Sequence, residues 1–214
     1  HADMDFTAKD PSVVAQLNID SADFRALKLS KDELRLRTLI HADISSMNVD
    51  YPDGVVNIDQ TTITAKGQRY FLDSLFISSK PNADTGQHIV VQADFMNAVV
   101  TGKTPLSEIG DIIQEHISRH YNIGGDSVKK ARAVPADYDL AVNMKIQDRP
   151  LLHILLPGLE SMDTIGVKAA LDPRNLSLNV DAPMVVYAGN TIDSAKVRVN
   201  GTDDAALVTA QSLE

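Results

Sequence analysis

Apolar and polar residues alternate along most of this chain. Between 34 and 44 the even-numbered positions are apolar or Thr, and the odd-numbered ones are mostly charged. A period of two is typical of a β-strand with one buried face. The same alternation covers 13–19, 89–95, 138–146, 165–171 and 176–182. Turn signals rich in Gly, Pro, Asn and Asp separate these runs, so the sequence predicts a mainly β protein.

One stretch, 104–120, changes the period. Its apolar residues fall on one stripe of a helix, and its charged residues fall opposite. The stripe consists of Leu106, Ile109, Ile112, Ile113 and Ile117. Thr104 suits the N-cap and Pro105 the first helical position. We expect an amphipathic helix over about 104–121 that serves as a plug or cap for the sheet, either as a fixed cap or as a moving gate.

Two further segments shape the domain organisation. Residues 122–137 have no period and contain Gly124-Gly125, so they are predicted to be a linker or mobile loop between β segments at 1–121 and 138–214. The apolar run between Pro150 and Pro157 predicts a short helical segment near 150–159. Because strand patterns continue on both sides of the linker, we expect one continuous unit.

Composition excludes several classes of function. The net charge of −9 argues against nucleic acid as a partner, because that binding depends on Lys and Arg. The chain has no Cys, which excludes disulfides and zinc–thiolate sites. Aromatic residues make up 5% and Trp is absent, so any core or groove is aliphatic. No run of about 20 apolar residues could span a bilayer.

Catalytic signatures are weak. His116 and His120 have the i, i+4 spacing of a shared metal site, but Ile117 stands where the zincin pattern needs Glu, and no third ligand is evident. Partly buried histidines at a helix edge explain the pair better. Carboxylates such as Asp139 and Asp181 are dispersed, without the convergence that acid–base catalysis needs. We therefore predict no enzyme, no cofactor and no metal. An enzyme such as a glycosidase or metalloprotease is kept as a third hypothesis, after the two that are given at the end of this section.

The aliphatic strand faces remain to be explained. They could bury each other in an ordinary sandwich core, or they could line a groove for acyl chains, and alternation alone does not decide between these. Thirteen residues are the groove candidates on the basis of their alternation. They are Leu36, Ile40, Ile44, Ile89, Val91, Phe95, Leu140, Val142, Met144, Ile146, Leu176, Leu178 and Val180.

A family resemblance favours the groove. Ala93 to Ile113 reads A-D-F-M-N-A-V-V-T-G-K-T-P-L-S-E-I-G-D-I-I, and I-S-R-H-Y-N-I follows up to Ile123. With Y-D-L-A-V-N-M-K-I at 138–146, L-P-G-L at 156–159 and L-S-L-N-V-D-A-P-M-V-V-Y-A-G at 176–189, the chain resembles the AsmA/TamB-like proteins of bacterial envelopes, particularly the Bacteroidetes type.

This resemblance implies a β-taco, a long curved sheet folded into a U-shaped groove. It implies a periplasmic segment of an inter-membrane bridge that carries phospholipid acyl chains toward the outer membrane and supports outer-membrane biogenesis. It also implies an outer-membrane β-barrel partner of the assembly machinery, and an inner-membrane anchor that we expect outside this sequence. The alternative is a β-rich scaffold with a filled core, which binds such partners through exposed strand edges and carries no lipid.

Overall fold

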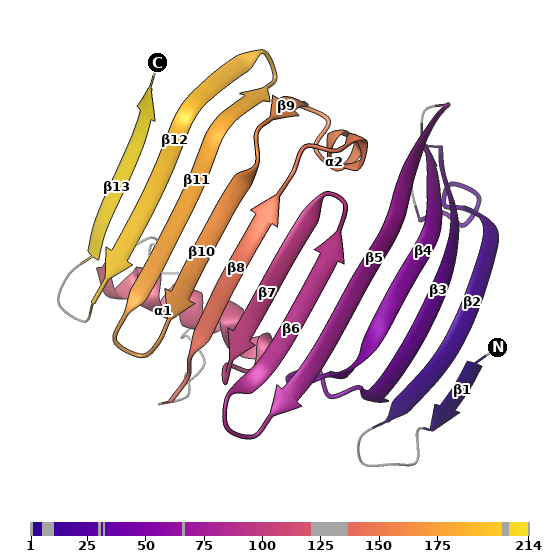
Figure 1. Cartoon of the computed structure of the whole chain (residues 1–214), viewed down its shortest axis with the longest axis horizontal. Helices are drawn as coiled ribbons and strands as arrows, with labels where there is room; N and C mark the ends of the chain where they lie inside the picture. The colour runs from indigo at the N-terminus through magenta and orange to yellow at the C-terminus, as the bar shows by residue number, and fades with distance from the viewer. Residues whose placement is uncertain are drawn as a thin grey trace.

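The computed structural model describes residues 2–5, 11–29, 31, 33–65, 67–120, 137–202 and 206–213. In this part of the chain, thirteen strands form one antiparallel sheet. The sheet is open and is not closed into a barrel (Figure 1). The sequence prediction of a mainly β protein with one long and one short helical segment is confirmed.

Neighbouring strands in the sequence are also neighbours in space. The strands are β1 (Ala2–Asp5), β2 (Ser12–Asp23), β3 (Leu34–Ser46), β4 (Asp53–Ala65), β5 (Gln68–Asn82), β6 (Gly86–Ala93), β7 (Met96–Gly102), β8 (Leu140–Ile146), β9 (Leu159–Met162), β10 (Ile165–Leu171), β11 (Leu176–Tyr187), β12 (Asn190–Gly201) and β13 (Ala206–Leu213). Twelve follow one path in chain order, and β9 pairs with β11 beside that path.

Helices occupy the two places where the meander is interrupted. The 3-10 turn η1 (Leu106–Glu108) and helix α1 (Ile109–His120) lie between β7 and β8, which still pair with each other. Helix α2 (Pro150–Leu155) and β9 lie between β8 and β10, which also pair. Figure 1 shows α1 behind the lower ends of the strands and α2 at their upper ends. We call these ends the lower rim and the upper rim.

Very little of the described chain is buried. Ten apolar side chains among the described residues are buried, and six of them belong to two small clusters that involve the helices. The protein exposes 14010 Å², whereas a compact monomer of 23.2 kDa exposes about 9,700 Å². Antiparallel sheets usually cover their apolar face with a second layer. In the described residues, two short helices at the rims are the only such layer.

Two local expectations are wrong. Thr104 does not cap the helix, because its hydroxyl donates a hydrogen bond of 2.8 Å to the carbonyl oxygen of Asp139, and the chain enters η1 through Pro105. The sequence Tyr51-Pro52-Asp53-Gly54 predicts a turn, but the turn ends earlier, since Asp53 and Gly54 already belong to β4. Gly54 is needed there for space: a Cβ would lie 2.6 Å from the carbonyl oxygen of Asp43.

Candidate functional site

An unbroken apolar row crosses the sheet at right angles to the strands. Each member pairs in register with the next, from β2 to β13. The row consists of Ala15, Ala42, Val56, Ile77, Val91, Ala98, Met144, Val167, Val180, Val197 and Ala210. Ten steps between strands make the row about 48 Å long. We call the side of the sheet that carries it the apolar face.

A second row runs beside the first, two residues nearer the lower rim in β8. It passes through Val100, Val142, Ala169, Leu178, Val199 and Val208 in the C-terminal half. In the N-terminal half it continues through Ile89 and Ile44, with Ser79 and Gly54 between them. The two rows together form the apolar strip, which is the candidate functional site.

Helix α1 forms a shoulder along the lower side of the strip. Ile112 of α1 packs with Tyr138 and Leu171, and Leu140 and Leu176 flank this cluster. Leu140 and Leu176 pair with Leu171 from either side, so α1 lies on the apolar face at the lower ends of β8, β10 and β11. Burial of these apolar side chains supplies the free energy that holds α1 on the sheet.

Helix α2 and β9 form the opposite shoulder at the upper rim. Leu152, Leu159 and Met162 make a buried cluster. Ile146, the last residue of β8, and Ile165, the first residue of β10, pair with each other and pack against it. On β8, Leu140 therefore lies under α1 and Ile146 under α2. Val142 and Met144 lie between the shoulders and belong to neither cluster.

The lower shoulder is extended by the loop between β3 and β4. The hydroxyl of Tyr51 donates a hydrogen bond of 2.8 Å to the carbonyl oxygen of Lys103, and the amide of Ser107 donates one of 3.1 Å to Oδ1 of Asp50. Burial, together with the negative charges of Asp50 and Glu108, raises the pKa of the Tyr51 hydroxyl, which therefore stays protonated as a donor. These bonds tie the start of α1 to a loop three strands away.

The structure brings most of the thirteen groove candidates onto the apolar face. All thirteen side chains are partly exposed, and none is buried or fully exposed. Leu140, Leu176 and Ile146 lie at the helix clusters, and the other strand residues belong to neither cluster. The alternation placed Phe95 in a strand, but Phe95 follows the end of β6 and packs against the α2 cluster.

The predicted helix stripe is only partly right. Ile112 has no exposed surface, and Leu106 and Ile109 are half-buried. Ile113, however, exposes 41% of its surface and does not face the sheet. His116, rather than Ile113, completes the buried side of α1. The side chain of Ile117 lies outside the described residues.

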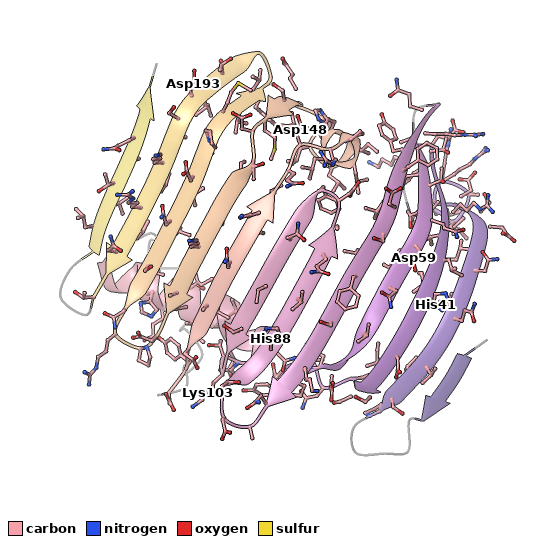
Figure 2. The ribbon with its side chains drawn as sticks, in the orientation of Figure 1. His41, Asp59, His88, Lys103, Asp148 and Asp193 are labelled. Atoms are coloured by element: carbon pink, nitrogen blue, oxygen red, sulfur yellow. The ribbon has the colours of Figure 1, made fainter. Side chains whose placement is uncertain are left out.

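Charged residues do not converge on a catalytic centre in the described part of the chain. Figure 2 shows His41, Asp59, His88, Lys103, Asp148 and Asp193 dispersed across the sheet and its rims. Within the described ranges, no three His, Asp or Glu side chains gather as metal ligands. His116 is buried and lies 2.7 Å from the hydroxyl oxygen of Tyr138, and the His120 side chain is not described.

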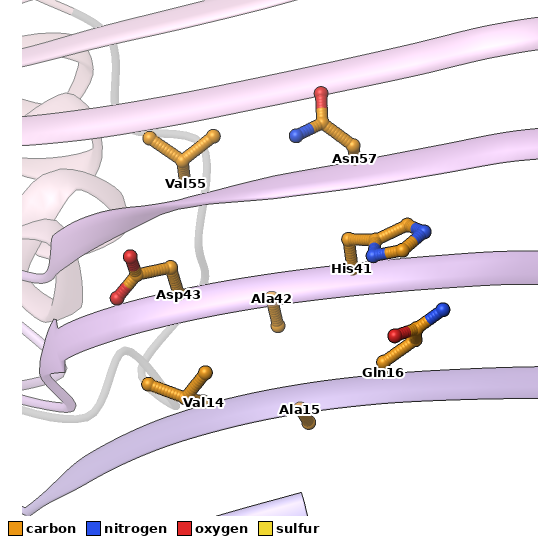
Figure 3. A pocket seen from close by; sticks show the side chains of 8 residues that line it. All are labelled: Val14, Ala15, Gln16, His41, Ala42, Asp43, Val55 and Asn57. Atoms are coloured by element: carbon orange, nitrogen blue, oxygen red, sulfur yellow. The ribbon is translucent and has the colours of Figure 1, made fainter. Parts of the chain in front are cut away.

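The opposite face of the sheet carries most of the charged and amide side chains, together with exposed apolar residues such as Val14 and Val99. A depression on it lies over β2, β3 and β4 and is lined by Val14, Val55, His41, Asp43 and Asn57. In Figure 3, Ala15 and Ala42 point away from these side chains toward the apolar face. Successive side chains of β2 and β3 thus point to opposite faces of the sheet, as the period of two in the sequence predicts (Figure 3).

Several strip residues were absent from the groove candidates. Ala98 and Val100 lie in a run where Val99 and Val100 adjoin, which hides the alternation. Val197 and Val199 alternate clearly, but only register shows that they continue the rows of β11. A search for apolar positions that pair across successive hairpins would have found them.

Comparisons with known proteins give no family. No family model, curated protein or solved structure matches this chain. Among the described residues, no helix is long and apolar enough to cross a membrane.

Proposed function

We propose that this chain is a segment of a periplasmic bridge-like protein, whose apolar strip holds the acyl chains of phospholipids on their way toward the outer membrane. The observation that carries the proposal is the unbroken apolar row, of which only Ala98 is buried and which no second layer of described residues covers. Hydrocarbon that replaces water on such a surface gains free energy without specific polar contacts. A surface that passes many lipid molecules along needs this lack of specificity.

The dimensions of the strip support the proposal. One acyl chain spans about 15 Å, half of the ~30 Å hydrocarbon core of a bilayer. A row of about 48 Å therefore has room for several chains. The shoulders formed by α1 and α2 leave two rows of residues open between them, as at Val142 and Met144 of β8. Hydrocarbon could lie along this strip while polar headgroups remain in water.

The remaining parts of the proposal rest on the family resemblance. They are an inner-membrane anchor elsewhere in the full-length protein, an outer-membrane β-barrel partner and a role in outer-membrane biogenesis. They would place the strip between the two membranes.

A matched pair of neighbours on β8 tests the strip. Val142 is half-buried on the apolar face, and Asn143 is exposed on the polar face. A photo-crosslinking residue at Val142 should capture phospholipid in cells, and one at Asn143 should not. Val142→Asp should lower the lipid that co-purifies without detergent, whereas Asn143→Asp should leave it unchanged. Native mass spectrometry measures the bound lipid, and circular dichroism checks the fold.

Two results would contradict the proposal. One is the absence of lipid crosslinks at Val142 in the otherwise native chain. The other is a folded Val142→Asp variant that keeps its lipid. If Val142→Asp unfolds the chain, the crosslinking experiment still decides, because it leaves the strip intact.

The scaffold is the second candidate, and strand edges favour it. In the described residues, β13 pairs only with β12, and β2 pairs with β1 only over Ser12 to Ala15. Unpaired edges can accept a partner strand. Lysine at Leu207 and Thr209 should weaken binding of a β-barrel partner and leave lipid crosslinking at Val142 unchanged. Loss of both would not fit a separate edge site.

A further inference from the structure

Helix α2 ends in an exposed apolar tip at the upper rim. Leu155 exposes 61% of its surface, Leu156 exposes 49%, and Pro157 follows them, also exposed. The first half of the same helix is different, because Leu151 and Leu152 are buried. Two of the four leucines in this short segment are therefore buried in the fold, and the other two are exposed.

Other exposed apolar residues extend this tip. The ring of Tyr187 lies against Gly158, where a Cβ would be 2.5 Å from Cζ of the ring, and Tyr187 exposes 48% of its surface. Ile192, which exposes 46%, pairs with Val185, a residue that packs against the α2 cluster. Leu155, Leu156, Pro157, Tyr187 and Ile192 together are named the rim patch.

The rim patch stands on a well-connected base. Nε2 of His153 lies 2.6 Å from Oδ1 of Asp148, and its Nδ1 lies 2.9 Å from the carbonyl oxygen of Leu159. Oδ2 of Asp148 accepts a hydrogen bond of 3.1 Å from the amide of Met162. Glu160 accepts one of 2.8 Å from the amide of Gly189. His153, Asp148 and Glu160 are thus engaged in hydrogen bonds within the fold.

The patch also adjoins the upper side of the apolar strip. The cluster beneath it includes Ile146 and Ile165, which end β8 and begin β10 on the apolar face. Leu27 and Leu29, in the turn between β2 and β3, expose 59% and 70% and lie at the same rim, because β2 runs toward it. The upper rim therefore presents apolar side chains near both halves of the sheet.

We propose that the rim patch inserts into the interfacial layer of a phospholipid bilayer and so brings the upper side of the apolar strip against hydrocarbon. This inference rests on the proposed lipid function for its purpose. Leucine at the tip with Tyr at its side is the side-chain chemistry of a membrane interface, where Tyr places an apolar ring and a polar hydroxyl. Apolar burial drives the contact, because a chain of net charge −9 gains nothing from anionic lipids.

A protein groove suits the patch less well. Helix-in-groove docking uses anchors at i, i+3, i+4 and i+7, which needs more than two turns. Helix α2 has six residues, and its first leucines are already buried. A second copy of the chain is the other possible occupant, and the experiment below separates it from a bilayer.

The absence of Trp in the chain gives a clean probe. In Leu156→Trp the only indole stands in the rim patch. Val49→Trp is the control: Val49 exposes 74% of its surface, but it lies in the β3–β4 loop at the lower rim. With phosphatidylcholine vesicles, the emission of Leu156→Trp should move to shorter wavelength and should be quenched by brominated chains. The emission of Val49→Trp should do neither.

Affinity for the vesicles gives the second readout. Leu155→Ser/Leu156→Ser should lower partitioning into phosphatidylcholine vesicles by about tenfold for each leucine lost. Met47→Ser/Val49→Ser should leave it unchanged. Adding phosphatidylglycerol to the vesicles should not strengthen binding. Circular dichroism checks that Leu151 and Leu152 still hold α2.

Three outcomes would overturn the inference. They are no spectral change for Leu156→Trp with vesicles, an equal change for Val49→Trp, or a change without vesicles that grows with protein concentration, which would indicate a second copy. Failure of the lipid function itself has a different signature, namely absence of lipid crosslinks at Val142. A patch that fails while Val142 still captures lipid would disprove the docking surface alone.

Discussion

Nε2 of His116 lies 2.7 Å from the hydroxyl oxygen of Tyr138, and both side chains are buried. Their rings meet edge to face, with centroids 6.1 Å apart and planes at 90°. Tyr138 stands just before β8, and His116 lies in the second turn of α1. The contact therefore fixes α1 to the sheet on the lower side of the apolar strip.

Tyr138→Phe should destabilise the protein by about 1–3 kcal/mol, because it removes a buried hydrogen bond and takes this partner away from Nε2 of His116. Tyr187→Phe is the control, since Tyr187 is 48% exposed, and its effect should be within about 0.5 kcal/mol. Urea unfolding followed by circular dichroism measures both. Equal effects would show that the buried contact adds nothing to stability.

Neighbouring isoleucines of α1 give a second prediction. Ile112→Ala should cost about 2–5 kcal/mol, because it opens a cavity at a fully buried position. Ile113→Ala should cost far less, because that side chain is 41% exposed. Unfolding midpoints in urea would compare the two. Equal losses would mean that both isoleucines face the sheet, as the predicted stripe has them.

Two threonines under the upper rim test the cost of unpaired hydroxyls. The Oγ1 atoms of Thr38 and Thr61 are 2.7 Å apart, and both side chains are buried. Each single Thr→Val change should destabilise the protein by about 1–3 kcal/mol, since one hydroxyl then lacks its partner. The double change should be close to neutral. A double-mutant cycle measures the coupling, and simple additivity would contradict this prediction.

Asp148 makes the stability of the α2 shoulder depend on pH. Burial alone would raise the pKa of Asp148, but the hydrogen bonds from His153 and the Met162 amide, with the charges of His153 and Arg149, lower it. Its contribution to stability is complete above the ordinary pKa of 3.8 and is lost as the pH falls through the lowered pKa of the folded protein.

Asp148→Asn should therefore lower stability at neutral pH and flatten the fall in stability on acidification below about pH 4. Asp193→Asn is the control and should keep the slope of the wild type. Thermal unfolding midpoints between pH 3 and pH 7 measure both variants. An unchanged acid slope in Asp148→Asn would assign the pH dependence to other carboxylates.

Two glycines should respond to Ala in opposite directions. A Cβ at Gly102 would lie 2.0 Å from the carbonyl oxygen of Asp139, and its φ is +142°, so Gly102→Ala should disrupt the junction between β7 and β8. At Gly110, in α1, a Cβ would meet nothing within 4 Å. Gly110→Ala should stabilise the protein by about 0.5–1 kcal/mol. Thermal unfolding decides, and stabilisation by both would refute the close approach at Gly102.

Local patterns in the sequence predicted most elements. The strict alternation at 138–146 and 176–182 became β8 and β11, and the two prolines around 150–157 bracketed α2. Alternation failed where a local bond or bulge intervened. The sequence Asp20-Ser21-Ala22-Asp23 is typical of a turn, but β2 continues through it with a register shift between Ile19 and Ala22. Thr104 looked like a cap, but Asp139, far away in the sequence, takes its hydrogen bond.

The candidate site was predictable in kind but not in extent. Alternation assigned Val142 and Leu178 to an apolar side, because each strand reports its own two faces. It could not show that Ala98, Met144 and Val167 stand in one row, since register is set by pairing between strands. It also could not show that Leu155 and Leu156 project outward while Leu151 and Leu152 are buried.

The sequence by itself determined that this protein is mainly β and that most strands have one aliphatic face, because the period of two follows from local backbone geometry. It left open whether that side fills a core or stays exposed. Only the tertiary structure decided this, because burial depends on whether another layer packs against the face. In the described chain, α1 and α2 cover the two rims and leave the strip between them open.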